Sequence, residues 1–300
     1  MVVRLLGSAA GGGVPQWNCG CRQCAAARTG LIEKRTQCCV AASADGRRWL
    51  FINASPDLRS QLLCFQVQPP AKQQRTPLEA VLLTDADIDH TLGLFLLRES
   101  DSALTVHSSK AIRKALDEGL RMTEVLRRYC GIRWIEAPSD FGPVLSCDGS
   151  ESGIEYKAVE IQGPGPRFRR RHNSSCRVFY VLRQSATFRS IVVAPAVAKL
   201  EPQLLAELDS ADAVLFDGTF WSNNDFERSG LPNPSPVGLL EGHLPILDGS
   251  LETIATLPAK KKVYIHINNT NPILWDGGPE RKQLDKLGIE VATDGMEFDL

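Results

Sequence analysis

The segment LLTDADIDHTLGL, residues 82–94, places three aspartates and one histidine between two apolar runs. The residues LEAVLLT (78–84) that lead into it are typical of a buried strand. TLGLFLLRES (91–100) has the length and the apolar spacing of a helix. We therefore predict that the motif lies in a strand-to-helix turn, where its side chains can converge in a cleft.

The three carboxylates of this motif are crowded. Asp85, Asp87 and Asp89 alternate along the chain, so in an extended segment they share one face and repel one another unless a cation offsets them. An aspartate ahead of an apolar helix is, taken alone, most often a helix cap. The cation hypothesis therefore needs partners elsewhere in the chain.

Two such partners follow other apolar strands. Asp217 ends the run AVLFD, and His266 follows KVYI, in the positions where ligands gather in layered α/β folds. Each has a simpler interpretation, since Asp217 could cap a turn and His266 could be a hydrogen-bonded core histidine. Their recurrence at strand ends favours a metal site made of Asp89, His90, His266 and Asp217.

Length and composition limit the number of domains, the partners and the cellular location that can be expected. The chain has 300 residues, a net charge of -1 and no repeat or low-complexity tract, so we predict one domain over residues 1–300. The balanced charge gives no reason to expect nucleic acid or a membrane surface as partner. The N-terminal apolar run is too short for a secretory signal, and no run approaches the ~20 apolar residues of a membrane span. A cytoplasmic protein is the expectation.

The other elements are mostly short strands. CVAASADGRRWLFINAS (39–55) predicts two strands joined at Asp45 and Gly46, which is a strong hairpin signal. Residues 110–129 predict one long helix, and residues 279–289 predict a late one. A strand is predicted from residue 2 that runs into a glycine loop at 11–13, and further strands are predicted at 104–109, 132–137, 154–161, 178–183, 190–195, 213–221 and 262–270, the last two ending in polar residues. Strand pairs mixed with helices indicate an α/β (α+β) protein with two sheets covered by helices.

A second metal site is predicted near the N-terminus. Cys19, Cys21 and Cys24 form a compact set of three thiols, whereas the other six of nine cysteines are scattered. Thiolates at this spacing suit a structural, tetrahedral zinc, which needs a fourth ligand. His243 in the loop EGHLPI is our first choice for that ligand, with His107 and Cys38 as alternatives.

The order of strand, acidic motif, helix, later Asp and later His resembles the metallo-β-lactamase superfamily. That superfamily carries His-x-His-x-Asp-His, and this sequence has Asp85 and Asp87 where the two leading histidines stand. The resemblance implies a four-layer αββα sandwich that has kept one metal position of two. Two imidazoles and one carboxylate are the ligand set of non-haem Fe(II) that activates O₂, although some zinc sites share it.

Longer motifs point to one family. LGSAAGGGVPQWNCGCRQC, INASPDLR, TDADIDHTLGL, DGTFW and HINNTNPIL together resemble the B proteins of pyrroloquinoline quinone (PQQ) biosynthesis. The resemblance implies work beside other PQQ biosynthesis proteins, either as an iron- and O₂-dependent hydroxylase of the tyrosine in a Glu-Tyr precursor or as a carrier of PQQ or its precursor towards the periplasm. The remaining metal position favours the hydroxylase, with Asp85 or Asp87 as the base for the phenolic proton. A hydrolase is the least favoured alternative.

The loop GPGPRFRRRHNSSCRVFYVL departs from the family pattern. Its basic residues are most simply a solvated loop. A sharper hypothesis is that they receive the carboxylates of an acidic precursor, because arginine binds carboxylates in a bidentate way. The residues concerned are Arg167, Arg169, Arg170, Arg171 and His172.

Overall fold

The computed structural model describes residues 1–65, 78–145, 149–169, 177–231 and 242–300. Its described strands form two sheets of seven. The first sheet contains, in spatial order, β14 (Glu297–Asp299), β1 (Val2–Gly7), β2 (Cys39–Ser43), β3 (Trp49–Ile52), β4 (Leu78–Leu82), β5 (Leu104–Ser108) and β6 (Ile132–Glu136). The second contains β13 (Glu290–Val291), β12 (Lys261–Ile265), β11 (Ala213–Asp217), β10 (Ser190–Ala194), β9 (Arg177–Gln184), β8 (Glu151–Ile161) and β7 (Gly142–Leu145).

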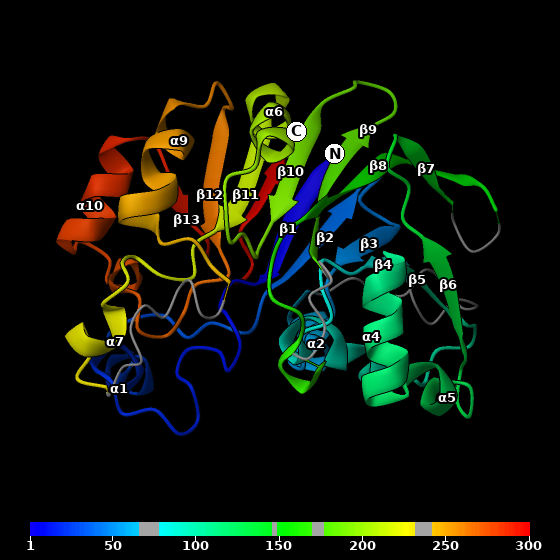
Figure 1. Cartoon of the computed structure of the whole chain (residues 1–300), viewed down its shortest axis with the longest axis horizontal. Helices are drawn as coiled ribbons and strands as arrows, with labels where there is room; N and C mark the ends of the chain where they lie inside the picture. The colour runs from blue at the N-terminus through cyan, green and yellow to red at the C-terminus, as the bar shows by residue number, and fades with distance from the viewer. Residues whose placement is uncertain (66–77, 146–148, 170–176, 232–241) are drawn as a thin grey trace.

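Helices cover the outer faces of the two sheets (Figure 1). The described α-helices are α1 (Arg22–Thr29), α2 (Leu58–Phe65), α3 (Ile88–Thr91), α4 (Lys110–Leu120), α5 (Met122–Leu126), α6 (Pro202–Ser210), α7 (Asp225–Arg228), α9 (Leu251–Thr256) and α10 (Pro279–Lys286). Those that pack on the sheets are α2, α4 and α5 on the first and α6, α9 and α10 on the second. Short turns of other helix types are η1 (Leu92–Leu97), η2 (Arg167–Arg169), η3 (Ile246–Ser250) and η4 (Pro272–Leu274). The predicted αββα sandwich is confirmed.

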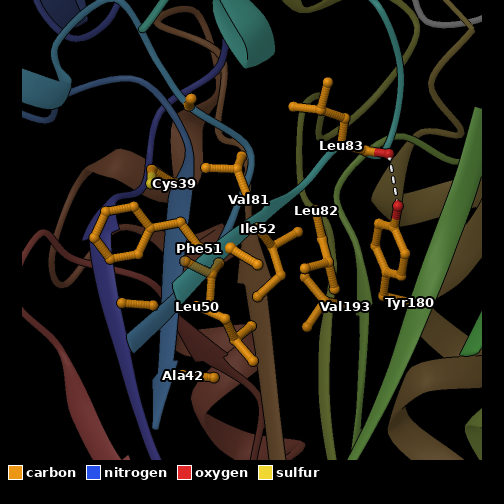
Figure 2. Packing of buried hydrophobic residues seen from close by; sticks show 14 of the residues in the cluster. Cys39, Ala42, Leu50, Phe51, Ile52, Val81, Leu82, Leu83, Tyr180 and Val193 are labelled. Atoms are coloured by element: carbon orange, nitrogen blue, oxygen red, sulfur yellow. Dashed lines mark hydrogen bonds between the residues drawn. The ribbon is translucent and has the colours of Figure 1, made fainter. Parts of the chain in front are cut away.

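The core lies between the sheets because strand side chains alternate between the two faces. Val193 of β10 and Leu82 of β4 belong to the cluster that joins both sheets, and Figure 2 shows them on the same side of β3 as Ile52, whereas the Phe51 ring points to the other side. Val192, next to Val193, belongs instead to the cluster that includes residues of α6, α9 and α10. The Tyr180 hydroxyl donates to the Leu83 carbonyl oxygen at 3.0 Å, which links the sheets close to the opening motif.

Strand direction brings the motifs to one edge. β3, β4, β5 and β6 pair in parallel, as do β10, β11, β12 and β13. The segments after β4, β11 and β12 therefore leave their sheets at carboxyl ends, where α/β folds place ligands. Asp85 and His266 lie in the segments after β4 and β12, and Asp217 is the last residue of β11.

Two helix predictions are wrong in extent. The helix predicted over 110–129 is broken at Arg121, whose φ of 51° is left-handed, into α4 and α5. The helix predicted over 91–100 begins earlier, with α3, and continues as the 3₁₀ turn η1. Gly93 permits this turn, because a Cβ there would overlap the carbonyl oxygens of Ala54 and Ser55. The hairpin around Gly46 is confirmed by the antiparallel pairing of β2 with β3.

The early start of α3 also changes the aspartates. Asp87 is the N-cap residue of α3 and Asp89 lies inside it, so the three carboxylates do not share one extended face. Each has a different environment instead. The prediction that the motif lies in a strand-to-helix turn is confirmed, since β4 ends at Leu82 and α3 starts at Ile88.

Candidate metal centre

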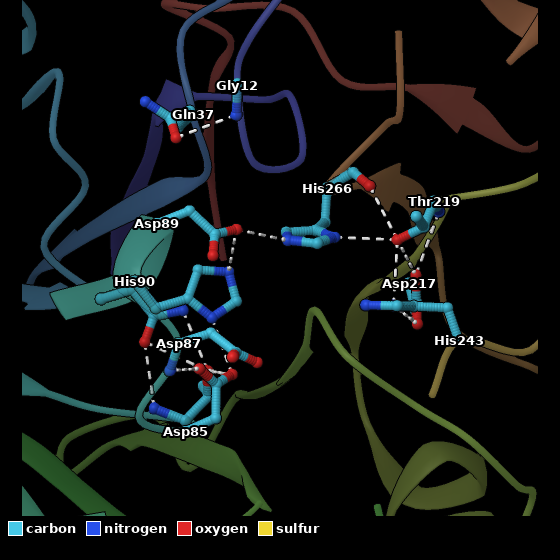
Figure 3. A network of polar contacts seen from close by, with 12 residues as sticks. Gly12, Gln37, Asp85, Asp87, Asp89, His90, Asp217, Thr219, His243 and His266 are labelled. Atoms are coloured by element: carbon cyan, nitrogen blue, oxygen red, sulfur yellow. Dashed lines mark hydrogen bonds and ion pairs between the residues drawn. The ribbon is translucent and has the colours of Figure 1, made fainter. Parts of the chain in front are cut away.

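Asp89, His90 and His266 meet at the carboxyl ends of the strands (Figure 3). The Asp89 Oδ2 atom lies 3.3 Å from His266 Nε2 and 3.7 Å from His90 Nε2. The two imidazole rings stand edge to face with centroids 4.9 Å apart. Both histidines are buried, and the His90 Nε2 atom has no hydrogen-bond partner in the described part of the chain.

Asp85 holds the other side of the His90 ring. Its Oδ2 atom lies 2.7 Å from His90 Nδ1 and accepts a hydrogen bond from the Thr84 hydroxyl, while Oδ1 accepts from the Asp87 backbone N–H. Burial raises the pKa of Asp85, but His90 and Arg177 outweigh it and lower the pKa to about 2. The ionised carboxylate fixes the proton of neutral His90 on Nδ1, so Nε2 presents a lone pair.

His266 is oriented in the same way by Thr219. The Thr219 Oγ1 atom lies 2.6 Å from Asp217 Oδ1 and 2.8 Å from His266 Nδ1. Its single proton goes to the closer, charged carboxylate, so the hydroxyl oxygen accepts from His266 Nδ1–H. The Nε2 atom of His266 then carries a second lone pair, which is directed at Asp89.

The three donor atoms fit a cation. Two imidazole lone pairs and a carboxylate oxygen face one another across 3.3 and 3.7 Å, an arrangement that repels unless a positive charge lies between them. In the protein without metal, a proton bound to His90 supplies this positive charge. Burial lowers the pKa of His90, but Asp85 and Asp89 outweigh burial and raise the pKa to about 9. A metal ion would displace that proton. The donor set suits a divalent ion of intermediate softness with open positions.

Asp217 is not part of this group. It is fully buried, and its carboxylate accepts from Thr219 through Oδ1 and from the Val197 N–H through Oδ2 at 2.8 Å. Of the two roles predicted for Asp217, fourth ligand or supporting acceptor, this geometry favours the second.

His243 does not join the cysteines, contrary to the prediction. Its Nδ1 atom lies 2.7 Å from Asp217 Oδ2, and its ring stacks on His266 with centroids 5.1 Å apart and planes 15° from parallel. The reason is that its loop returns to the end of β11, where the buried carboxylate binds the imidazole. The alternatives fail similarly, because His107 contacts Tyr156 and Cys38 is buried near Asp85 and Asp89.

The three cysteines do come together, at the start of α1. Cys21 caps this helix, its Sγ atom accepting from Cys24 N–H at 3.4 Å, and Cys24 Sγ accepts from Gln16 N–H at 3.3 Å. The side-chain amide of Asn269 lies 3.1, 3.6 and 3.3 Å from the sulfurs of Cys19, Cys21 and Cys24. Asn269 thus occupies the position that the sequence assigned to His243.

A cavity of about 610 Å³ opens in front of the metal group, a size that suits a small ligand. Its walls combine polar and aromatic side chains. The lining residues include Asp87, Arg167, Arg177, Phe220, Phe226, Leu231, His243 and Asn269.

The two carboxylates predicted as bases differ in access to this cavity. Asp85 is bound to His90 and does not line it, so the prediction for Asp85 as the base is not supported by its position. Asp87 lines the cavity, and its Oδ2 atom lies 3.6 Å from the Arg177 guanidinium. Burial, with Asp85 and Asp89 adding to it, raises the pKa of Asp87 to about 6 although Arg177 opposes this.

The basic loop is only partly described. The prediction that Arg169 binds substrate carboxylates is not supported by its position, because Arg169 does not line the cavity. It pairs with Glu118 and donates to the Lys114 carbonyl oxygen of α4. Arg167 does line the cavity. The predictions for Arg170, Arg171 and His172 lie outside the described residues.

Sequence reasoning missed three residues. Thr219 follows Asp217 by two positions and Asn269 follows His266 by three, so their closeness to predicted ligands was an available signal. Arg177 gave no such signal, since it appeared as one more residue of a basic loop. It is in fact the buried first residue of β9.

An Asp85→Asn substitution is expected to lower metal affinity in the cavity about 10- to 100-fold without abolishing binding. An asparagine amide has a single oxygen, so either His90 Nδ1–H or the Asp87 N–H would face the amide NH₂ group instead of an acceptor. Groups that support metal-bound histidines have effects of this size on affinity. Competition with a chelator of known affinity measures the change. Asp87→Asn is the matched control, because the Asp87 carboxylate makes no hydrogen bond to His90 and only the backbone carbonyl, which the substitution keeps, accepts from the His90 N–H. Equal affinities of wild type and Asp85→Asn would contradict the role given to Asp85.

The comparisons agree with this fold and site. A profile of the beta-lactamase superfamily domain matches residues 48–267. A diphosphatase of the PhnP family, 18% identical over 100% of this chain and 97% of its own, shares the fold with a TM-score of 0.70. The fold and the metal group thus define a protein of the metallo-β-lactamase class.

Closer relatives share one name. Coenzyme PQQ synthesis protein B of Methylococcus capsulatus is 39% identical, and that of Cupriavidus necator 38%, each over 99% of both chains. A Zn²⁺-bound PqqB structure from Methylobacterium extorquens is 32% identical over 100% of both chains, with a TM-score of 0.89. The chain belongs to the coenzyme PQQ synthesis protein B family. Among its described residues, no helix has the length and apolar character needed to cross a bilayer.

Proposed function

We propose that this protein acts in PQQ synthesis as an O₂-dependent hydroxylase of the tyrosine ring in a Glu-Tyr precursor, with one non-haem iron held by Asp89, His90 and His266. The observation that supports it is the arrangement of two imidazole lone pairs and one carboxylate beside an open cavity. This ligand set is associated with Fe(II) that activates O₂, and that activation is the chemistry a bound iron would supply.

The surrounding residues have separate tasks in this proposal. Asp85 and Thr219 fix the tautomers of the two histidines. Asp87, a carboxylate that lines the cavity and is not one of the proposed metal ligands, accepts a proton from the substrate. Arg167 and Arg177 give the cavity positive charge that suits the carboxylates of an acidic dipeptide.

The cysteine group holds a structural zinc in this proposal, with Asn269 as the fourth ligand. In a tetrahedral zinc site with sulfur and oxygen ligands, neighbouring donor atoms lie about 3.5 Å apart. The Asn269 amide lies 3.1 to 3.6 Å from all three sulfurs, which supports this position. A half-turn of the amide exchanges its nitrogen and oxygen and directs Oδ1 at the metal.

Oxygen consumption tests the proposal. Hydroxylation replaces one ring C–H by C–OH, uses one O₂, two electrons and two protons, and releases one water, so the assay contains a two-electron reductant such as ascorbate. Protein loaded anaerobically with Fe(II) is mixed with O₂ and Glu-Tyr, with Glu-Phe as the matched control. We expect O₂ uptake and a product heavier by one oxygen only with the tyrosine dipeptide.

Other outcomes would overturn it. Protein that consumes no O₂ above background but binds PQQ without a redox metal would be a carrier. Two zinc ions in the cavity, with hydrolysis of a phosphodiester or lactam, would indicate the superfamily's hydrolytic chemistry.

A further inference from the structure

His243 forms part of the cavity wall that none of the tasks above uses. Its side chain is about nine-tenths buried, yet the residue lines the cavity. The ring stacks on His266 and meets the edge of Phe220, with centroids 6.4 Å apart. Packing on both sides leaves the imidazole little freedom to turn.

The hydrogen bonds of His243 fix which nitrogen faces the cavity. Nδ1 lies 2.7 Å from Asp217 Oδ2, a buried carboxylate oxygen that also accepts from the Val197 N–H at 2.8 Å. Nδ1 therefore carries the proton. Nε2 is left as a hydrogen-bond acceptor, because both hydrogen-bonding contacts that described residues make with the His243 ring are to Nδ1.

A metal ion is a poor partner for His243. Asp217, His243 and His266 are close enough to be considered a metal group. The Thr219 hydroxyl, however, lies 2.6, 3.0 and 2.8 Å from Asp217 Oδ1, His243 Nδ1 and His266 Nδ1. That hydroxyl already occupies the space between these atoms (Figure 3).

The neighbours of His243 are aromatic and apolar. Phe220 and Phe226 lie with centroids 5.9 Å apart, and both line the cavity with Leu231. An apolar wall of this kind accepts an aromatic ring, and the Nε2 acceptor beside it matches a ring that carries a hydroxyl group.

We propose that His243 Nε2 accepts a hydrogen bond from the phenolic hydroxyl of the substrate, so that His243 selects p-hydroxyphenyl over phenyl groups. The inference rests on the proposed function for the identity of the substrate. With the hydroxyl held at His243, Asp87 is left to accept the proton that the ring carbon loses on hydroxylation.

Anaerobic binding to protein whose cavity holds zinc tests this without turnover. Calorimetry compares Glu-Tyr with Glu-Phe, and we expect wild type to bind Glu-Tyr about threefold to tenfold tighter, the range for one hydrogen bond. In His243→Phe this ratio falls to about one with unchanged affinity for Glu-Phe. His243→Gln, which keeps a donor for Asp217, provides a second variant in case the phenylalanine disturbs folding. His107→Gln, outside the cavity, keeps the wild-type ratio.

The contrary results are distinct. Wild type without a preference, or His243 variants that keep it, would overturn the inference while leaving the hydroxylase proposal intact. Loss of cavity metal in both His243 variants would also overturn it, by making His243 a metal ligand. A His243-dependent preference in a protein that shows no O₂ uptake would refute the proposed function alone.

Discussion

A His90→Ala protein is expected to lose metal from the cavity while keeping the metal at the cysteines. The substitution removes one of three donor atoms, the buried Nε2 that has no other partner in the described structure. It also leaves the buried Asp85 carboxylate without the ring that matches its charge. We expect metal affinity in the cavity to fall by more than the about 10- to 100-fold that loss of a supporting group causes, and O₂ uptake to fall to background.

Metal analysis after reconstitution and desalting measures this directly. Wild type should hold one metal ion in the cavity and one zinc at the cysteines, whereas His90→Ala should hold only the zinc. His107→Gln is the matched control, since His107 is also a buried histidine but contacts Tyr156 instead of the cavity. Full cavity occupancy in His90→Ala would place the metal centre elsewhere.

A Cys24→Ser protein is expected to lose zinc and much of its stability. Cys24 is fully buried, and its sulfur lies beside Cys21 and Asn269 at the start of α1. Structural zinc contributes folding free energy directly. If the loss amounts to several kcal/mol, the melting temperature falls by about 10 °C in a chain of this size.

The same substitution is expected to weaken metal binding in the cavity. Asn269 lies three residues after His266, and Gln23 of α1 donates to the Thr270 carbonyl oxygen at 2.8 Å, so the cysteine group holds the segment that carries His266. His266 has a left-handed φ of 57°, a conformation that its surroundings must enforce.

Thermal unfolding and chelator competition measure the two effects of Cys24→Ser. Cys64→Ser is the control, because Cys64 is an exposed thiol on α2. Unchanged stability together with unchanged zinc content in Cys24→Ser would contradict the structural role of the cysteine group.

Local patterns in the sequence predicted the elements that carry the site. Apolar runs ending in polar residues located β4, β11 and β12, and with them His90, Asp217 and His266. Strand pairs mixed with helices indicated two covered sheets, and the resemblance specified the sandwich. These features depend on residues close together in the chain, where alternation and turn chemistry are legible.

The sequence alone could not show that residues of the same type in one motif lie in different environments. Asp85, Asp87 and Asp89 looked alike, yet one supports a histidine, one lines the cavity and one faces the metal position. The difference arises because α3 starts inside the motif and turns each side chain in another direction.

By itself the sequence determined the layered α/β class, the strand-to-helix position of the motif and the three-cysteine cluster, because short-range periodicity and spacing encode them. Only the tertiary structure decided that His243 lies at Asp217 and Asn269 at the sulfurs. Those choices depend on which loops meet at the carboxyl edge of two sheets. The two contacts join residues that are 26 and 250 positions apart in the chain, so tertiary packing sets them and local sequence pattern does not.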